Sequence, residues 1–572
     1  MRKKLAAMLL AVALVVGLLS LSACGGTGDT PGQTVTETPK QSDTAGTAET
    51  AKVTEPAEPP ETAESKNPAG PKDPTEPEGP AGPKDPTEPE GPTEPEEPTE
   101  PEEPAEPEEP AEVLYSGDCG ENVTWTLDSS GTLTISGSGP MDSYASIPPV
   151  ITMPPYAQYS NKITITRVVI ENGVTSIGDC AFGTFADLHG LTSVTIPESV
   201  TKIGDRAFGG CRSLTSVTIP ESVTEIGNSA FVGCRSLTSV TIPESVTEIG
   251  NGTFSNCTGL TSVTIPESVT KLGESAFSGC TGLTEVTIPD SVTSIGDRAF
   301  QNCTSLTSVA IGSGVTSIGE YAFGDCAGLT SVTIGNGVTS IGDYAFYNCT
   351  SLTGVAIPDS VTSIGDGAFR DCTGLTGVAI PDSVTSIGDS AFRDCTSLTE
   401  VTIPESVTKI GEMAFYGCTG LTEVTIPESV TIIGLSAFSG CTGLTEVTIP
   451  DSVTSIGDRA FQDCTGLTSV TIGNSVTSMG YHTFQDCTGL TSVAIGNSVT
   501  SIGYSAFYNC TSLTEVTIPE SVTKIEQTAF YNCTSLTDVY YNGSETQWNQ
   551  ITIDNGGNSN YYLLNATIYY NS

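Results

Sequence analysis

Histidine, tryptophan and basic residues are scarce in this chain. Its 572 residues include two histidines, two tryptophans and 21 lysines and arginines, against 67 aspartates and glutamates. The resulting net charge of −46 excludes a nucleic-acid surface, since phosphates require lysine and arginine, and disfavours docking on bare anionic lipid. Cysteines and aspartates near His189 and His482 all belong to the repeat described below, so they do not indicate a nucleophilic site. No glycine-rich phosphate loop follows a strand. We therefore expect no enzyme.

A long apolar run occurs at the N-terminus. Leu5–Leu21 follows three basic residues and is slightly too short, and wrongly flanked, for a membrane-spanning helix. The run ends in Leu21-Ser22-Ala23-Cys24, which resembles the lipobox of bacterial lipoproteins. That resemblance implies a signal peptide over residues 1–24, cleavage before Cys24 and a diacylglycerol on the Cys24 sulfur. The alternative is an ordinary export signal that happens to meet a cysteine.

Residues 25–112 contain almost no large apolar side chains, and they hold 24 acidic residues against five lysines. Proline restricts the backbone and like charges repel, so this segment is predicted to be a disordered, extended spacer rich in Pro, Glu and Thr. A polyproline-like conformation would reach roughly 270 Å at about 3.1 Å per residue. Such a spacer could hold a folded domain away from a membrane, although it could also be a mere solubilising linker.

The remainder of the chain repeats every 23 residues. One phenylalanine marks each unit, and the marks are Phe208, Phe231, Phe254, Phe277, Phe300, Phe323, Phe346, Phe369, Phe392, Phe415, Phe438, Phe461, Phe484, Phe507 and Phe530. An earlier unit around Phe182 is three residues longer. A fixed period of this length is typical of a solenoid, in which each unit buries its apolar face against the next.

The pattern within one unit predicts its local structure. Leu237–Ile242 reads L-x-x-V-x-I, a strand with Val240 and Ile242 facing inward, and Val223–Ile226 predicts a second, shorter strand. Ala230, Phe231 and Cys234 between them suit one helical turn. A glycine follows this second strand in each unit from Gly178 to Gly503 and becomes Glu526 in the last, which indicates either a positive φ or a close backbone approach. Stacking at about 4.8 Å per unit predicts a rod of roughly 75 Å for about sixteen coils.

The repeat V-T-x-I-G-x-x-A-F-x-x-C-x-x-L-x-x-V-x-I-P resembles the BspA-like group of bacterial leucine-rich repeat surface proteins. This resemblance covers residues 168–539 and implies a β-rich leucine-rich-repeat solenoid. It also implies an N-terminal β cap over residues 113–167 and a C-terminal cap over residues 540–572. Cys119–Ile135 predicts a β-hairpin, and Tyr540–Tyr570 predicts a strand, a short helix around Trp548 and a closing strand. Each cap holds one tryptophan, for which plugging the end of the solenoid is a simpler interpretation than ligand contact.

The 18 cysteines do not form an obvious disulfide framework. Apart from Cys24, fifteen of them, from Cys211 to Cys533, follow the repeat and should point into one core layer as buried thiols. Stacked side chains of this kind run parallel and do not face each other across a disulfide. A zinc site would need short spacings such as C-x₂-C, which the sequence lacks. Cys119 and Cys180 lie outside the column and could form a bridge between the N-terminal cap and the first coil.

Two sets of outward residues are candidate contact sites. The first is an acidic face that could attract Ca²⁺ or a basic partner, or could simply be solvated, and it consists of Glu400, Glu405, Glu423, Glu428, Glu446 and Asp451. The second is a set of tyrosines on the turn side that suits protein or glycan contacts, and it consists of Tyr321, Tyr344, Tyr347, Tyr416, Tyr508 and Tyr531. We predict no catalytic residue, no resident metal and no cofactor other than this candidate Ca²⁺.

These observations favour a lipid-anchored solenoid on the outside of a bacterial cell that works by binding an extracellular protein or glycan. The resemblance goes further, because proteins of this group are often described as adhesins. Two alternatives remain open: a passive structural or cell-wall spacing module, and a polysaccharide-binding accessory protein.

Overall fold

A computed structural model describes residues 111–571 except 145, 148, 149, 184, 185 and 187. These residues belong to one compact unit, Pro104–Ser572. The predicted signal peptide, the Cys24 lipidation site and nearly all of the predicted spacer lie outside the described residues. Within the described part, no helix has the length and apolar character needed to cross a membrane.

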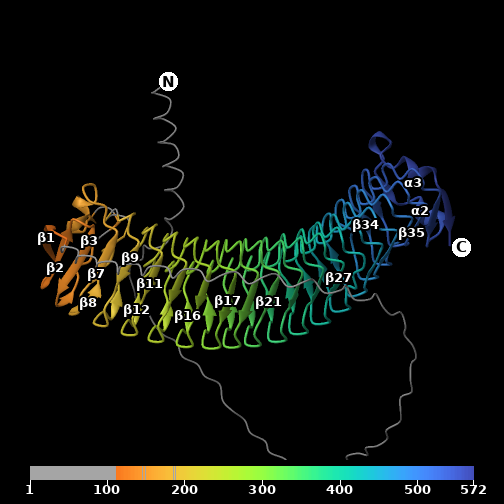
Figure 1. The fold of residues 1–572 in the computed structure, drawn as a ribbon. Helices are drawn as coiled ribbons and strands as arrows, with labels where there is room; N and C mark the ends of the chain where they lie inside the picture. Colours follow the sequence, from red (N-terminus) through yellow and green to blue (C-terminus); the bar gives the residue numbers. More distant parts are fainter. Residues whose placement is uncertain (1–110, 145, 148–149, 184–185, 187, 572) are drawn as a thin grey trace, which may run out of the picture. The chain divides into compact units, whose positions relative to one another are not determined.

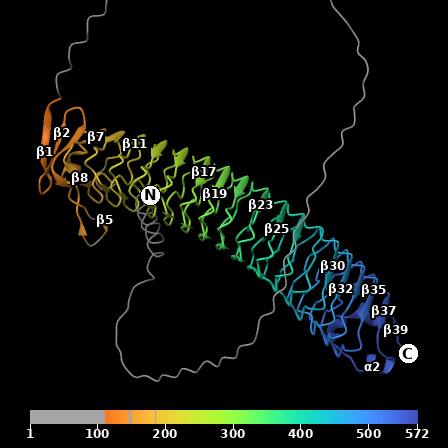
Figure 2. The same cartoon turned by 90° about the horizontal axis from the view of Figure 1, so that it is seen from below.

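The main strands of successive coils pair in parallel, and they form three consecutive sheets along the stack. Ser239, Val240 and Thr241, for example, pair in register with Ser262, Val263 and Thr264 of the next coil. Figures 1 and 2 show the coils following one another in chain order. The main strands are β7 (Arg167–Ile170), β9 (Ser193–Thr195), β11 (Ser216–Thr218), β13 (Ser239–Thr241), β15 (Ser262–Thr264), β17 (Glu285–Ile288), β19 (Ser308–Ile311), β21 (Ser331–Thr333), β23 (Gly354–Ala356), β25 (Gly377–Ala379), β27 (Glu400–Thr402), β30 (Glu446–Ile449), β32 (Ser469–Ile472), β33 (Ser492–Ala494), β35 (Glu515–Ile518), β37 (Asp538–Tyr541) and β39 (Thr567–Tyr570).

A second row of shorter strands runs beside the first. These strands also pair in parallel and in register, as Lys271 and Leu272 do with Ser294 and Ile295. They are β8 (Val174–Ile177), β10 (Lys202–Ile203), β12 (Glu225–Ile226), β14 (Glu248–Ile249), β16 (Lys271–Leu272), β18 (Ser294–Ile295), β20 (Ser317–Ile318), β22 (Ser340–Ile341), β24 (Ser363–Ile364), β26 (Ser386–Ile387), β28 (Lys409–Ile410), β29 (Ile432–Ile433), β31 (Ser455–Ile456), β34 (Ser501–Ile502), β36 (Lys524–Ile525) and β38 (Thr552–Ile553). The predicted solenoid, with a main and a short strand in the coil, is confirmed; in two coils one of these strands is reduced to a single bridge, Thr402–Thr425 in the main row and Ser478–Ser501 in the short row.

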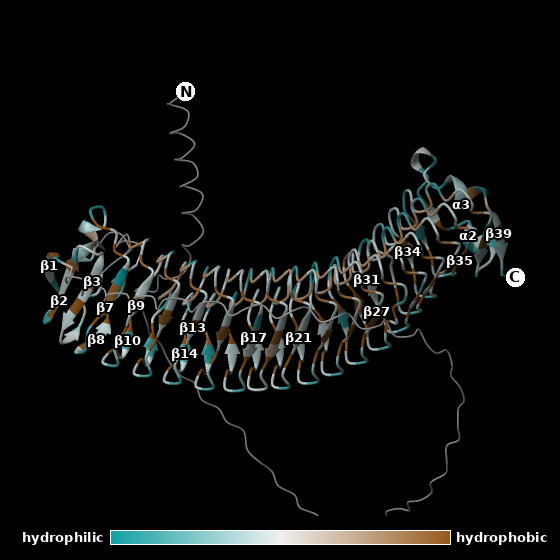
Figure 3. Cartoon of the chain, viewed as in Figure 1, coloured by the Kyte–Doolittle hydropathy of each residue, from teal (hydrophilic) through white to brown (hydrophobic). Residues whose placement is uncertain are grey.

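The interior of the stack is a set of apolar columns. Phe182 and the fifteen repeat phenylalanines from Phe208 to Phe530 are fully buried, and neighbouring rings stack with centroids 5.2–5.5 Å apart. The inward residues of both strands, such as Val240 and Ile226, are also buried. Figure 3 shows the same alternation of hydrophobic and hydrophilic segments recurring from coil to coil. Because each coil buries its apolar side chains against its two neighbours, the core runs the length of the stack.

The segment predicted as a helical turn consists of consecutive tight turns. Val232 N–H donates to the Ser229 carbonyl and Cys234 N–H donates to the Phe231 carbonyl, each three residues back. The backbone does not continue as a helix because the residue two before phenylalanine has a positive φ in every coil, as Ser229 does at 56°. In the fifteen units from Phe208 to Phe530, the residue two after phenylalanine also has a positive φ, and it is glycine, asparagine or aspartate.

The glycine column after the short strand reflects close backbone approach. A Cβ built on Gly227 would lie 2.5 Å from the Asp205 nitrogen and 2.6 Å from the Gly204 carbonyl carbon, both in the preceding coil. The φ of Gly227 is outside the left-handed region. Of the two predicted reasons for this column, the structure therefore supports tight stacking of coils.

Both ends of the described solenoid carry additional elements. At the N-terminal end, β2 and β3 form the predicted hairpin, and β1 adds an antiparallel strand that the sequence analysis did not predict. At the C-terminal end, α2 lies between β37 and β38, and α3 precedes β39. Trp125 and Trp548 are both buried, which agrees with their predicted role as apolar plugs. The elements are β1 (Val113–Gly120), β2 (Val123–Asp128), β3 (Thr132–Gly137), β4 (Gly139–Pro140), β5 (Ser146–Ile147), β6 (Val150–Ile151), η1 (Pro155–Tyr159), α2 (Glu545–Trp548), η3 (Gly556–Asn558) and α3 (Tyr561–Asn565).

Candidate functional site

Many polar columns on the solenoid hydrogen-bond from one coil to the next. Thr238 Oγ1 donates to the Thr215 carbonyl at 3.3 Å, and Ser268 Oγ donates to the Val246 carbonyl at 2.7 Å. Asn251 N–H donates to Asn228 Oδ1 at 2.8 Å, and equivalent bonds recur along the stack. These serine, threonine and Asx positions help to hold the coils together. Columns that vary in residue type are therefore better candidates for recognition.

The predicted acidic face is exposed along three successive coils. Glu400, Glu423 and Glu446 occupy the same column, one per coil, and Glu405, Glu428 and Asp451 occupy the column after the proline; all six are exposed. The structure thus places them in two rows, as the repeat requires. Asp451 Oδ1 accepts a hydrogen bond from the Asn474 backbone N–H at 2.7 Å, so this carboxylate also links its coil to the next one. Among the described residues, no group of three or more His, Cys, Asp and Glu side chains is arranged to hold a metal ion.

Calcium is expected to leave the melting temperature of the protein unchanged. The six carboxylates lie in open rows, whereas Ca²⁺ prefers six to eight oxygens that converge on one point. The measurement is a thermal unfolding series at rising CaCl₂, with MgCl₂ as a control for ionic strength. A rise in melting temperature with Ca²⁺ alone would restore the calcium interpretation.

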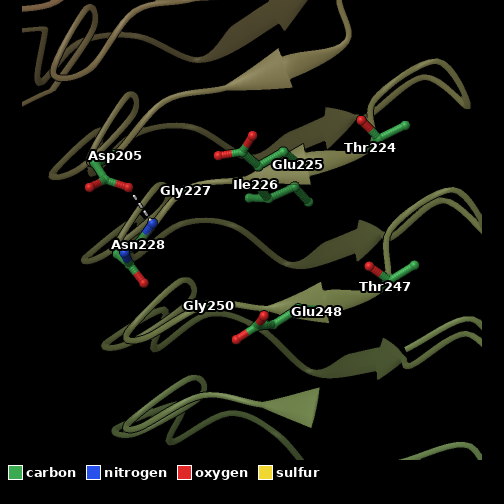
Figure 4. Close-up of a pocket in the computed structure, with 9 residues that line it drawn as sticks. All are labelled: Asp205, Thr224, Glu225, Ile226, Gly227, Asn228, Thr247, Glu248 and Gly250. Carbon is green, nitrogen blue, oxygen red and sulfur yellow. Dashed lines mark hydrogen bonds between the residues drawn. The ribbon is translucent and has the colours of Figure 1, made fainter. Parts of the chain in front are cut away.

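A polar hollow of about 290 Å³ opens between two coils on the short-strand side (Figure 4). Glu225 and Glu248 lie there on neighbouring rungs, and β12 and β14 belong to different sheets at this point. Like charges side by side on adjacent strands repel, so this position is electrostatically unfavourable. Lys202 pairs with Glu225 at 2.7 Å and Lys271 pairs with Glu248 at 3.0 Å. The sequence analysis missed this hollow, although the order Lys, Glu, Glu, Lys in one column is a readable signal.

The cysteine column is buried, as predicted, and it also donates hydrogen bonds. Each of the fifteen thiols from Cys211 to Cys533 donates to the carbonyl of a phenylalanine one coil earlier, with Sγ–O distances of 3.1–3.3 Å. Burial raises the pKa of the Cys211, Cys372 and Cys464 thiols to about 12. Cys119 and Cys180 are buried free thiols, so the suggested bridge between them is not found.

The column cysteines are expected to resist alkylation in the folded protein. Burial blocks the reagent at every column position, and at Cys372, whose pKa burial raises to about 12, the reactive thiolate is also absent at pH 8. Iodoacetamide treatment at pH 8 followed by mass spectrometry should leave Cys211–Cys533 unmodified, and unfolding in urea should expose all fifteen. Rapid labelling of mid-column cysteines in the native protein would contradict this packing.

The structure brings three of the predicted tyrosines together and places the others elsewhere along the turn side. Tyr321 and Tyr344 stack with centroids 4.8 Å apart, and Tyr347 meets both edge-on at 5.9 and 6.0 Å. Tyr508 and Tyr531 stack separately at 5.1 Å. Tyr416 instead contacts the Arg393 guanidinium, whose central carbon lies 4.9 Å from its ring centroid. Tyr531 is exposed and the other five are half-buried, so these tyrosines form rigid, partly accessible clusters.

The two histidines have ordinary surroundings. His189 Nδ1 lies 3.3 Å from the Gly210 carbonyl oxygen. His482 contacts Gln485 and meets the Tyr504 ring edge-on at 5.3 Å. Neither arrangement matches a nucleophile with its base and a group that orients the base.

Comparison with protein families identifies the repeat. A model described as the BspA type leucine rich repeat region matches residues 152–284, 293–422 and 431–558. Comparison with curated proteins gave no match.

Solved structures of bacterial leucine-rich repeat proteins are similar to this chain. One from Bacteroides ovatus is 29% identical with a TM-score of 0.53, over 79% of this chain and 99% of that protein. A protein from Faecalibacterium prausnitzii, described as a leucine rich cell surface protein, is 29% identical with a TM-score of 0.35, over 77% of this chain and 99% of that one. The Treponema pallidum leucine rich repeat protein is 34% identical with a TM-score of 0.27, over 28% of this chain and 77% of that one. The first of these likenesses supports the fold directly.

Proposed function

The chain belongs to the BspA-type leucine-rich repeat family, and from that premise we propose that it is a lipid-anchored cell-surface binding protein, an adhesin that engages host or bacterial surface proteins through its solenoid. A leucine-rich repeat solenoid is typical of proteins that bind other proteins and have no catalytic role. The proposal adds the lipid anchor, the surface location and the adhesive role to that general function.

The observation that supports binding is the contrast between constant and variable columns. Buried positions repeat almost without change, with fully buried phenylalanine in each coil from Phe182 to Phe530. The position directly after that phenylalanine faces the turn side and varies among glycine, valine, serine, glutamine, tyrosine and arginine. A stack that keeps its core constant while its turn-side residues differ can present a specific surface at chosen coils.

The proposed location depends on the sequence before residue 111. The signal-like segment with Cys24 would place the mature N-terminus in a membrane leaflet through a diacylglycerol. The Pro/Glu-rich stretch of residues 25–112 would then serve as a spacer between that anchor and the folded part. One lipid chain gives only weak anchoring, whereas two acyl chains on one glycerol hold a protein stably.

The test is binding of the purified full chain to an array of matrix proteins, mucins and polysaccharides, with and without calcium. We expect saturable binding to a protein, and we expect it to disappear when particular coils are removed in whole 23-residue units. Removing other coils should have no effect, since the site is local. If the folded chain bound none of the surfaces, a passive spacing module would become the better explanation; a hit confined to polysaccharides would favour the accessory role.

A further inference from the structure

Two arginines and two tyrosines form one row on the turn side of the solenoid. Tyr347, Arg370, Arg393 and Tyr416 each follow the core phenylalanine directly, in four successive coils. We call these four residues the tyrosine–arginine row. Among the fifteen units from Phe208 to Phe530, this position holds arginine only at these two coils, which are adjacent. The juxtaposition is notable because residues 113–572 hold 43 acidic residues and only 13 basic ones.

The two guanidinium groups lean in opposite directions along the row. The central guanidinium carbon of Arg370 lies 5.8 Å from the Tyr347 ring centroid, and that of Arg393 lies 4.9 Å from the Tyr416 ring centroid. Each arginine therefore has its own aromatic neighbour on the side away from the other arginine. A guanidinium near an aromatic ring is stabilised by the ring quadrupole, so this arrangement separates two like charges on neighbouring coils.

Most of the guanidinium donors have no partner among the described residues. Arg393 Nε donates to Asp394 Oδ2 at 3.1 Å, and Arg393 Nη1 has only a long contact of 3.7 Å with Met413 Sδ. Arg370 Nε lies 3.4 Å from Asp371 Oδ2 and makes no hydrogen bond. Each arginine forms an ion pair with the aspartate that follows it, through Nε alone. A guanidinium carries five N–H donors in a planar fork that matches a carboxylate. The row therefore presents unused donors in a fixed position.

Aromatic rings lie on one side of the row, and the carboxylates of Asp371 and Asp394 lie beside its arginines. Tyr347 packs edge-on against the stacked Tyr321 and Tyr344, which extends the aromatic surface by one coil. The arginine side chains are only 30% and 28% exposed, so little rotamer freedom is left to lose on binding. Tyrosine and arginine are the residue types most enriched among the energetically dominant contacts of protein interfaces.

We infer that the tyrosine–arginine row is a docking site for an acidic protein segment, in which an aspartate or glutamate of the partner binds Arg370 and Arg393 and apolar side chains beside it pack on the tyrosines. This inference deepens the proposed function, on which it rests, by naming the coils and the chemistry of the partner. A long polyanion such as a sulfated glycan is disfavoured, because the acidic surface around the row would repel its remaining charges. A single carboxylate flanked by apolar residues meets less of that repulsion, because it must approach only beside Asp371 and Asp394 and can use the Nη donors that these two carboxylates leave free.

The inference is tested with 12-residue peptides that carry Asp-Glu between leucine and phenylalanine residues, with an Asn-Gln version of each, and with heparin as a polyanion. Binding of each probe to the purified full chain is measured by biolayer interferometry. We expect the acidic peptides to bind at least about tenfold more tightly than their amide versions. The double variant Arg370→Gln/Arg393→Gln should reduce acidic-peptide binding to the amide level.

Matched controls are available within the chain. Arg212 and Arg235 are also on successive coils, but both are exposed. Arg212→Gln/Arg235→Gln removes the same charge and should leave peptide binding unchanged. Tyr508→Ala/Tyr531→Ala alters the same column at other coils and should also have no effect, whereas Tyr347→Ala/Tyr416→Ala should weaken binding. Melting temperatures of all variants establish that each is folded.

Three results would overturn the inference: equal binding of acidic and amide peptides, equal loss in both arginine double variants, or row-dependent binding of heparin in preference to peptides. None of these results would contradict the proposed function, which is tested by binding to the array of matrix proteins, mucins and polysaccharides. Conversely, if the acidic peptides bound the tyrosine–arginine row but no surface of the array bound the chain, the docking site would be retained and the adhesin function would be contradicted.

Discussion

Replacing Phe438 by alanine is expected to lower the free energy of unfolding by about 4 kcal/mol. The Phe438 ring is fully buried and stacks on Phe415 and Phe461, with both centroids 5.3 Å away. Alanine leaves a cavity inside a column whose coils are fixed by backbone ladders on two sides, so the neighbours have little freedom to close it. The measurement is urea unfolding followed by circular dichroism.

The control for this variant is Tyr531→Ala. Tyr531 is 44% exposed and stacks only on Tyr508, so its loss should cost about 1 kcal/mol or less. Similar losses for the two variants would show that the phenylalanine column does not dominate the stability of the stack.

Gly365→Ala is expected to destabilise the solenoid by about 3 kcal/mol through the addition of one methyl group. A Cβ on Gly365 would lie 2.5 Å from Asp343 Oδ1 and 2.7 Å from both the Asp343 nitrogen and the Gly342 carbonyl carbon. These atoms belong to the preceding coil, and Asp343 Oδ1 accepts the Asp366 N–H at 2.9 Å. The methyl group must push the coils apart and disturb this hydrogen bond. Hydrogen exchange of the two coils should show the loss locally.

Gly354→Ala is the matched control. Gly354 lies eleven residues before Gly365, in the main strand β23. A Cβ built there has nothing within 4 Å, and the position is exposed. Alanine should be neutral or should stabilise the protein by about 0.5 kcal/mol, because it reduces the freedom of the unfolded chain. If both variants behaved alike, close backbone approach would not explain the glycine column.

The 23-residue period was sufficient to predict the coil, its two strands and the buried phenylalanine and cysteine columns. Periodicity works here because each position meets its own counterpart in the next coil, so one local interpretation holds for all repeats. The glycine column stayed ambiguous between two causes, and only the position of the preceding coil's backbone separated them. The bridge that Cys119 and Cys180 could have formed was left open from the sequence, and both are free thiols in the structure, because sequence spacing does not establish that two thiols face each other.

Other features could not be predicted from one unit alone. The left-handed residue two before phenylalanine includes Arg298, Tyr321 and Met413, side chains that give no sign of a positive φ. The thiol donors were hidden because cysteine in an apolar column suggests packing only. Tyr347 and Tyr416 were predicted as contact residues, but Arg370 and Arg393 were not, since their relation appears only when the same position is compared across coils.

The central claim, that the solenoid is the binding part of a surface protein, is tested most directly by adhesion of cells that display the chain. One strain displays the full chain, and another displays a version without residues 168–539 that keeps the signal, the spacer and both caps. Attachment of each strain to surfaces coated with matrix proteins or epithelial cells is counted, and display is checked with an antibody to the spacer. We predict strong attachment of the first strain and background attachment of the second. Equal attachment at equal display would contradict the account.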